Sequence, residues 1–193
     1  ARLLDRGCAL PASYTPHLMR SAAREQTPTQ LSLLVNAGGN WNARSPSGHC
    51  AIHDAASQGG VDVVTYLMDH GADVNAKTKH GERPLHMASK KGRCDVVRLL
   101  LERGANVRVV TEPPDLATPV HAACARGHTA VIKLLLISCW GLCEQSDGLG
   151  RTPLHLAVEV ENVEMARTLL VDYNVGASTV TKDGCTPLWS AVL

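Results

Sequence analysis

One short phrase recurs along the chain at a nearly constant interval, and this repetition constrains the fold more than any other feature. Its markers are four histidines and, in the last copy, a tryptophan: His53, His86, His121, His155 and Trp189. These markers lie 33, 35, 34 and 34 residues apart. A second marker keeps the same interval, since Gly38, Gly71 and Gly104 are each separated by 33 residues. Periods of about 20–50 residues are typical of repeat proteins, in which each unit contacts only its neighbours.

One copy in the middle of the chain shows what a unit contains. Pro84 stands where the first turn of a helix tolerates proline, because the missing N–H would have no partner there. This helix is expected to end at Gly92. Val96, Leu99 and Leu100 then follow at spacings of three and four, which places them on one face of a second helix. Two helices this short cannot bury their apolar faces alone, so the units are expected to stack into a solenoid.

Two phrases carry a family resemblance. Thr-Pro-Leu-His-Leu-Ala at 152–157 and Gly-Ala-Asp-Val-Asn-Ala at 71–76 resemble the signature of the ankyrin repeat family, and the resemblance covers nearly the whole chain. It implies an all-α solenoid of helix-turn-helix units with hairpin-like connecting loops. We expect clear repeats at 45–77, 78–112, 113–146 and 147–180, a degenerate repeat at 12–44, the tail of a broken repeat at 1–11 and the head of a further, incomplete repeat at 181–193. The array is therefore expected to continue beyond both ends.

Composition narrows the class of function. The chain has 19 Lys plus Arg against 18 Asp plus Glu, so it lacks the basic surplus with which nucleic-acid-binding proteins neutralise phosphates. Aromatic residues are 3% and Phe is absent, which disfavours a stacking platform for single strands. No apolar run reaches the roughly 18 residues of a membrane-spanning helix, so no membrane insertion is predicted. The 7 Cys residues show no paired spacing, which favours reduced thiols and a cytoplasmic or nuclear location.

The histidines are expected to be structural. In ankyrin repeats the marker histidine bonds to the backbone of the neighbouring turn and to the threonine of its own phrase. This role is implied for His53, His86, His121 and His155, with Thr118 and Thr152 as threonine partners. Metal ligands must converge, whereas these side chains would be spread along the stack.

Neither a metal nor a catalytic site is predicted. Cys139 and Cys143 have a spacing found in some zinc sites, but no second pair accompanies them. No nucleophile–base pair or glycine-rich phosphate loop is evident. We therefore expect a protein without a cofactor that is not an enzyme, and an enzyme fragment is the least expected reading.

The expected recognition surface is the concave groove that ankyrin arrays form from hairpin tips and first helices. The predicted groove residues are Asp54, Lys77, Lys79, His80, Met87, Lys90, Lys91, Arg126 and Glu159. Residues 76–110 carry nine Lys or Arg against three Asp or Glu, whereas residues 144–183 carry three against seven. This asymmetry predicts a partner protein that presents an acidic segment to a basic centre. The alternative is a solvated face that only keeps the array soluble.

Such a module fits several settings. It is expected to be part of a larger scaffold or adaptor. It could recruit substrates for a ubiquitin ligase adaptor, which would carry cullin-binding helices beyond Leu193, or inhibit a transcription factor.

Three local features depart from the repeat pattern. The turn at 111–116 is two residues longer than its neighbours and contains two prolines. It is either a partner contact or a tolerated insertion in a surface loop. Trp140 and Leu142 are unusually apolar for a connecting loop, so they are either contact residues or packed against the neighbouring loop. Asn75, preceded by Leu67 and Asp73, resembles the site preferred by the asparaginyl hydroxylase that modifies ankyrin repeats. It could instead simply bond across adjacent turns.

Overall fold

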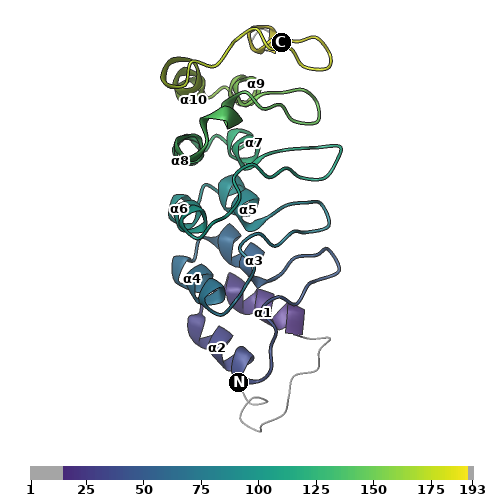
Figure 1. Cartoon of the computed structure of the whole chain (residues 1–193), viewed down its shortest axis with the longest axis vertical. Coiled ribbons are helices and arrows are strands. Elements are labelled where there is room, and N and C mark those ends of the chain that lie inside the picture. The colour runs from purple at the N-terminus through teal and green to yellow at the C-terminus, as the bar shows by residue number, and fades with distance from the viewer. Residues whose placement is uncertain (1–14, 191–193) are drawn as a thin grey trace.

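The computed structural model describes residues 15–190, which form an elongated stack of short helices (Figure 1). The broken repeat expected at 1–11 lies outside the described residues, as do the last three residues of the expected 181–193 unit. The α-helices are α1 (Thr15–Arg24), α2 (Pro28–Asn36), α3 (Ala51–Gln58), α4 (Val61–Asp69), α5 (Pro84–Lys90), α6 (Cys94–Glu102), α7 (Pro119–Cys124), α8 (Thr129–Ser138), α9 (Pro153–Glu159), α10 (Val163–Arg167) and α11 (Pro187–Ser190). A 3₁₀-helix, η2 (Trp140–Cys143), follows α8, and a π-helix, η3 (Thr168–Asp172), continues α10.

The helices form two columns. Helices α1, α3, α5, α7 and α9 contact one another in sequence and make the inner column, while α2, α4, α6 and α8 make the outer one, which α10 extends (Figure 1). Within residues 15–190, the main contacts of each helix are with its partner in the same unit and with the adjacent units, as the repeat period predicts. The described residues thus form the all-α solenoid that was expected.

The helix boundaries follow from local sequence signals. Pro84, Pro119 and Pro153 each open an inner helix at its first position. Gly92 and Gly127 adopt left-handed φ angles of +68° and +73° and end the turns after α5 and α7, a conformation that costs glycine little because it has no Cβ. Sequence therefore sets both ends of these helices.

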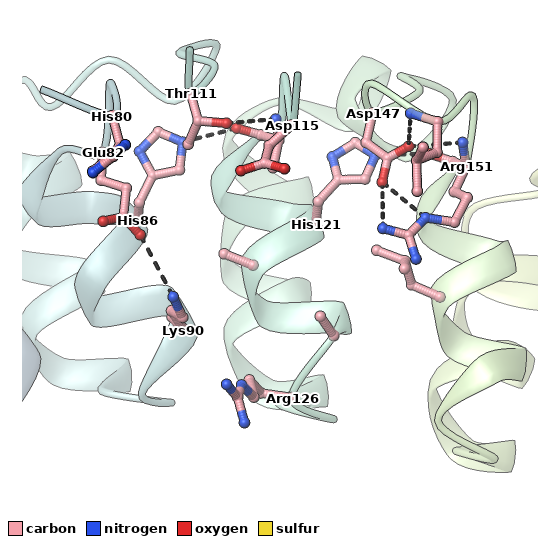
Figure 2. A pocket seen from close by; sticks show the side chains of 15 residues that line it. His80, Glu82, His86, Lys90, Thr111, Asp115, His121, Arg126, Asp147 and Arg151 are labelled. Atoms are coloured by element: carbon pink, nitrogen blue, oxygen red, sulfur yellow. Dashed lines mark hydrogen bonds and ion pairs between the residues drawn. The ribbon is translucent and has the colours of Figure 1, made fainter. Parts of the chain in front are cut away.

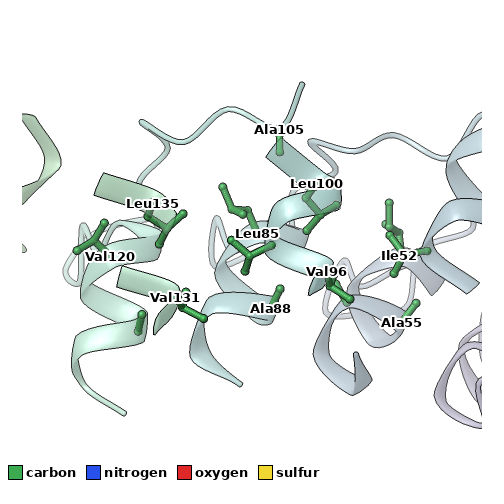
Figure 3. Close-up of a cluster of buried hydrophobic side chains, with 14 of the residues drawn as sticks. Ile52, Ala55, Leu85, Ala88, Val96, Leu100, Ala105, Val120, Val131 and Leu135 are labelled. Carbon is green, nitrogen blue, oxygen red and sulfur yellow. The ribbon is translucent and has the colours of Figure 1, made fainter. Parts of the chain in front are cut away.

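The core is a continuous aliphatic layer between the two columns (Figure 3). Leu85 and Leu100, from inner helix α5 and outer helix α6, are at most 1% exposed. Ala55 and Ala88 hold equivalent places on successive inner helices and are fully buried, so the helices can approach closely. Each fully buried Leu side chain contributes about 1.5–3 kcal/mol relative to an exposed one.

Hairpin-like loops project from the inner column toward one side of the stack (Figure 1). We call them fingers 1 to 5, and they comprise residues 45–49, 78–82, 111–117, 147–151 and 181–185. Each is closed by a backbone hydrogen bond between its end residues, as from Thr78 N–H to Glu82 O at 2.9 Å. Finger 3 closes from Thr111 to Ala117 and is two residues longer than the others, as expected from the sequence.

Backbone hydrogen bonds also join each finger to the one before it. Lys79 N–H donates to Ser47 O at 3.1 Å, and Glu112 N–H donates to His80 O at 2.8 Å. Gly148 N–H donates to Asp115 O at 2.7 Å. The fingers therefore form one connected wall beside the inner helices.

Candidate protein-binding groove

A row of buried histidines connects each inner helix to the following finger. The ring Nε2 atoms of His53, His86, His121 and His155 lie 3.0–3.1 Å from the carbonyl oxygens of Ala76, Ala117, Arg151 and Cys185. Each Nδ1 accepts a hydrogen bond from the backbone N–H three residues earlier, at 3.2–3.3 Å. A carbonyl only accepts and an N–H only donates, so the geometry requires a neutral ring protonated on Nε2.

Burial also favours the neutral form of these rings. Desolvation lowers the pKa of His53 and of His86 to about 4, and it also lowers the pKa of His121. Within residues 15–190, no group of three or more His, Cys, Asp or Glu side chains is arranged to hold a metal ion. These histidines therefore hold the walls of the groove in place.

The threonines of the repeated phrase complete this network. Thr118 Oγ1 lies 2.7 Å from His121 Nδ1, and Thr152 Oγ1 lies 2.9 Å from His155 Nδ1. Thr118 Oγ1 also accepts a hydrogen bond from the backbone N–H of His121, which caps α7.

Replacing one of these threonines should cost stability without changing chemistry. We expect Thr152→Ala to lower the free energy of unfolding by about 1–3 kcal/mol, since it removes a buried hydrogen-bond partner. Urea denaturation followed by circular dichroism measures this. Thr29→Ala, at an exposed position of α2, is the control and should stay within about 0.5 kcal/mol of the wild type. Equal effects of the two substitutions would contradict the assigned role of Thr152.

A cavity of about 380 Å³ lies in the groove between the fingers and the inner helices (Figure 2). It spans helices α5, α7 and α9 and fingers 2 to 4. Its polar lining consists of His80, Glu82, His86, Lys90, Thr111, Asp115, His121, Arg126, Asp147 and Arg151. Ala122, Ala125, Leu149 and Leu156 supply most of its apolar lining.

Charges of both signs line this cavity (Figure 2). The fingers contribute Glu82, Asp115, Asp147 and Arg151, whereas the helix side contributes Lys90 and Arg126. The sequence predicted a basic centre, and the structure brings three carboxylates to the same cavity.

Two ion pairs fix part of this charge. Lys90 Nζ lies 3.5 Å from Glu82 Oε1, and Arg151 Nη2 lies 2.8 Å from Asp147 Oδ2. Burial opposes ionisation of Asp147, but hydrogen bonds from the Arg151 side chain and backbone outweigh it and lower the pKa of the carboxyl group. The Asp147–Arg151 pair therefore stays charged and rigid at neutral pH.

The predicted groove residues fall into three groups. His80, Lys90 and Arg126 line the large cavity, and Lys91 lines a smaller one next to it. The side chain of Lys77 is taken up by an ion pair with Glu112, and that of Glu159 by one with Arg151 at 3.1 Å. Outside both cavities, Lys79 is exposed and Met87 is half-buried.

Asp54 has a different position from the one expected. It is buried and forms ion pairs with Arg20 and Arg24, the latter at 2.8 Å between Nε and Oδ1. These contacts join α1 of the degenerate repeat to α3. The carboxylate is thus a contact within the stack, and its two arginine partners were not identified from the sequence because they lie outside the repeated phrase.

Finger 3 contributes Thr111 and Asp115 to the cavity, and its turn was noted in the sequence as a possible partner contact. Sequence reasoning missed Asp147, Leu149 and Arg151 of finger 4, although this finger is equivalent to finger 2 in the repeat.

The apolar segment after α8 is not a finger. Trp140–Cys143 form the 3₁₀-helix η2, in which Leu142 is 2% exposed and Trp140 is 65% exposed. Leu142 joins the core, which agrees with the packing alternative and not with a surface contact. Trp140 is at the surface.

Asn75 bonds across adjacent units. Its Oδ1 accepts from Asn106 N–H at 2.9 Å, and its Nδ2 donates to Gly104 O at 3.4 Å. Asn42 makes the same pair of bonds one unit earlier, to Asp73 N–H and Gly71 O. The side chain of Asn75 therefore has a structural role.

Together, a two-column helical stack, a connected wall of fingers and a groove between them define a solenoid of the protein-binding class. Within residues 15–190, no helix has both the length and the apolar character to cross a bilayer. A family model described as "Ankyrin repeats (3 copies)" matches residues 18–111 and 110–183. The chain belongs to the ankyrin repeat family, whose repeats mediate protein–protein interaction.

Two relatives resemble part of the chain. One is the nuclear factor NF-kappa-B p105 subunit of Gallus gallus, which is 38% identical over 69 residues, or 36% of this chain. The same subunit of Mus musculus is 35% identical over 69 residues. The match spans 7% of the length of each relative.

Proposed function

We propose that this chain is a module that binds a partner protein in the groove between its fingers and inner helices. The observation that carries the proposal is the 380 Å³ cavity, because it collects side chains from three consecutive units into one site. Buried histidines and the Asp147–Arg151 pair hold these side chains in place before binding. A preorganised surface loses little conformational entropy on association, which favours affinity.

Filling the cavity tests this proposal. Ala125 is an exposed alanine in the cavity lining, and Ala130 is an exposed alanine on outer helix α8. We expect Ala125→Trp to weaken a partner by about tenfold or more, equivalent to at least about 1.4 kcal/mol, whereas Ala130→Trp should leave affinity unchanged. Quantitative affinity capture with the wild type and the two variants would identify the partner. Calorimetry with the purified partner would then measure the change in affinity. A partner that is displaced only by Ala130→Trp would place recognition on the opposite face.

We further propose that the partner presents an acidic segment to the exposed lysines Lys79 and Lys91. Lys79 and Lys91 are exposed, and among the described residues neither has a carboxylate within ion-pair distance. Reversing both to Glu should slow association by roughly tenfold at low salt and flatten its dependence on ionic strength. Arg98→Glu with Arg108→Glu changes the net charge equally at exposed positions outside both cavities and is the control. Association kinetics that are the same for the two double variants would contradict an acidic segment.

A second candidate function is binding and inhibition of a transcription factor. The relatives named nuclear factor NF-kappa-B p105 subunit favour it, through 69 aligned residues. A location in the cytoplasm or nucleus accords with this candidate. Capture of a transcription-factor subunit that Ala125→Trp releases would support it, together with reduced DNA binding by that subunit in a gel-shift assay.

Asn75 is further proposed as a hydroxylation site. The side chain is half-buried, and its two cross-unit bonds use only the amide group, so the Cβ atom takes no part in them. Incubation with the asparaginyl hydroxylase, iron and 2-oxoglutarate should add one oxygen atom to the peptide that contains Asn75. Asn42, which lacks the preceding acidic residue, should stay unmodified. An unmodified Asn75 beside a hydroxylated control substrate would end the proposal.

A further inference from the structure

A second, smaller cavity lies beside the first, where the inner helices turn toward the outer ones. Its volume is about 320 Å³, and its lining is Lys90, Lys91, Arg126 and His128. No acidic side chain lines it. It shares Lys90 and Arg126 with the larger cavity, whereas Lys91 and His128 line this one alone.

Two equivalent turns bring the basic side chains together. Lys91 precedes Gly92 at the end of α5, and Arg126 precedes Gly127 just after α7, and both glycines have left-handed φ angles. Because α5 and α7 pack side by side, the two cations occupy the same position in consecutive units.

His128 is held against the turn of the preceding unit. A Cβ atom added at Gly92 would lie 2.7 Å from His128 Nδ1, so the absence of a side chain at Gly92 makes room for the imidazole. The ring is therefore a positioned part of the cavity wall.

The charge in this cavity is largely uncompensated. Lys90 has one partner, Glu82, at 3.5 Å. Across residues 15–190, no carboxylate lies within 4.0 Å of the side-chain nitrogens of Lys91, Arg126 or His128. Like charges gathered without counterions repel one another, so an anion bound between them would be stabilised.

The position of Lys91 and Arg126 is uncharged in the flanking units, where Gln58 precedes them and Val160 follows. Arg93 lies against Gly59 in the preceding turn, and its Nε donates to Ser57 O at 3.2 Å. At this position of the repeat, the two cations therefore come only from Lys91 and Arg126.

We propose that this cavity binds a phosphorylated serine or threonine side chain of the partner protein. A phosphate monoester carries a charge of about −1.5 to −2 and three acceptor oxygens, which match several converging N–H donors better than a single carboxylate does. The planar guanidinium of Arg126 can donate two parallel hydrogen bonds to such a group, and Lys91 can neutralise its second charge. This inference rests on the proposed function and specifies the chemistry of its ligand.

The test uses a short probe that does not depend on knowing the partner. A blocked pentapeptide with phosphoserine between alanines, and its serine and glutamate counterparts, are titrated into the protein and followed by two-dimensional amide NMR. We expect saturable shifts for the phosphopeptide at residues 90–93 and 125–128, and at least tenfold weaker binding of the other two peptides. Lys91→Gln with Arg126→Gln should abolish the saturable shifts, whereas Arg98→Gln with Arg108→Gln should preserve them.

The possible outcomes separate this inference from the groove proposal. Equal binding of the phosphoserine and glutamate peptides, or shifts that survive Lys91→Gln with Arg126→Gln, would overturn the phosphate site. If Ala125→Trp weakens partner binding but the phosphopeptide causes no saturable shifts, the phosphate site is overturned and the groove proposal stands. The third outcome is that Lys91→Gln with Arg126→Gln abolishes the saturable shifts while Ala125→Trp leaves partner affinity unchanged. This outcome would support the phosphate site and reject the groove.

Discussion

Acidification from pH 6.5 to pH 5 is expected to lower the free energy of unfolding of the array steeply. The folded-state pKa of His53 and of His86 is about 4, well below the ordinary value of 6.5. In this window the unfolded chain therefore binds protons that the folded protein does not, and stability falls as the pH falls. Each such histidine contributes a slope of roughly 1.4 kcal/mol per pH unit.

The main physical reason is burial, because a buried imidazolium ion loses its hydration. A second proton would also have to be placed on Nδ1, which already accepts a backbone N–H, as in His86 from Arg83 at 3.2 Å. His121, with a lowered pKa, adds to the effect in the same direction.

Urea denaturation at pH 7, 6.5, 6, 5.5 and 5 measures the slope above the range in which ordinary carboxyl groups titrate, near pH 4. His86→Asn should be less stable at pH 7 but lose stability less steeply on acidification. Thr29→Ala, which replaces an exposed side chain that does not titrate, should keep the wild-type slope. The same slope in His86→Asn and in the wild type would show that the buried ring does not carry the effect.

Gly148→Ala is expected to separate fingers 3 and 4. A Cβ atom at Gly148 would lie 1.5 Å from the carbonyl oxygen of Pro114, far inside van der Waals contact, and backbone atoms cannot rotate away as a side chain can. The nearby Gly148–Asp115 hydrogen bond, at 2.7 Å, should be lost with the displacement. We expect a loss of about 3 kcal/mol in the free energy of unfolding.

The matched control is Gly176→Ala, since a Cβ atom there has no neighbour within 4 Å. Neither glycine has a left-handed φ angle, so alanine adds no backbone strain at either site and the difference isolates the contact with Pro114. Urea denaturation compares the two variants. The larger cavity should also lose affinity for its partner in Gly148→Ala, because Asp115 and Asp147 line it from fingers 3 and 4. A Gly148→Ala protein as stable as the control would show that the two fingers are not packed as described.

Local sequence predicted most of the repeat architecture. The Pro at the start of α5, α7 and α9, the left-handed Gly after α3, α5 and α7 and the marker His are local signals, and these helices begin and end where those signals place them. The degenerate unit lacks the Thr-Pro phrase, yet α1 and α2 form a helix pair whose Met19 and Leu31 are at most 1% exposed. This unit was predicted because residues such as Leu33, Leu34 and Gly38 keep the register of the other repeats.

The candidate site was predicted only in part, because charge counted along the chain takes no account of pairing. Lys77 and Lys90 were counted as free positive charge, but Glu112 and Glu82 pair with them. His128 was not considered for the surface at all, and the stacking of two turns brings it to Lys91 and Arg126.

The repetition alone determined that the chain folds as a stack of helix pairs, since short amphipathic helices at a constant period can bury their apolar faces only against their neighbours. Tertiary structure decided which charged and polar side chains pair within the stack and which remain free to bind a partner. Residues about one period apart become neighbours in space, so Arg20 meets Asp54 and Arg103 meets Asp69, each 34 positions along the sequence. An ion pair between units depends on rotamers and on the offset of adjacent units, neither of which is encoded in the period. The groove and its basic side cavity therefore emerge only when the units are stacked.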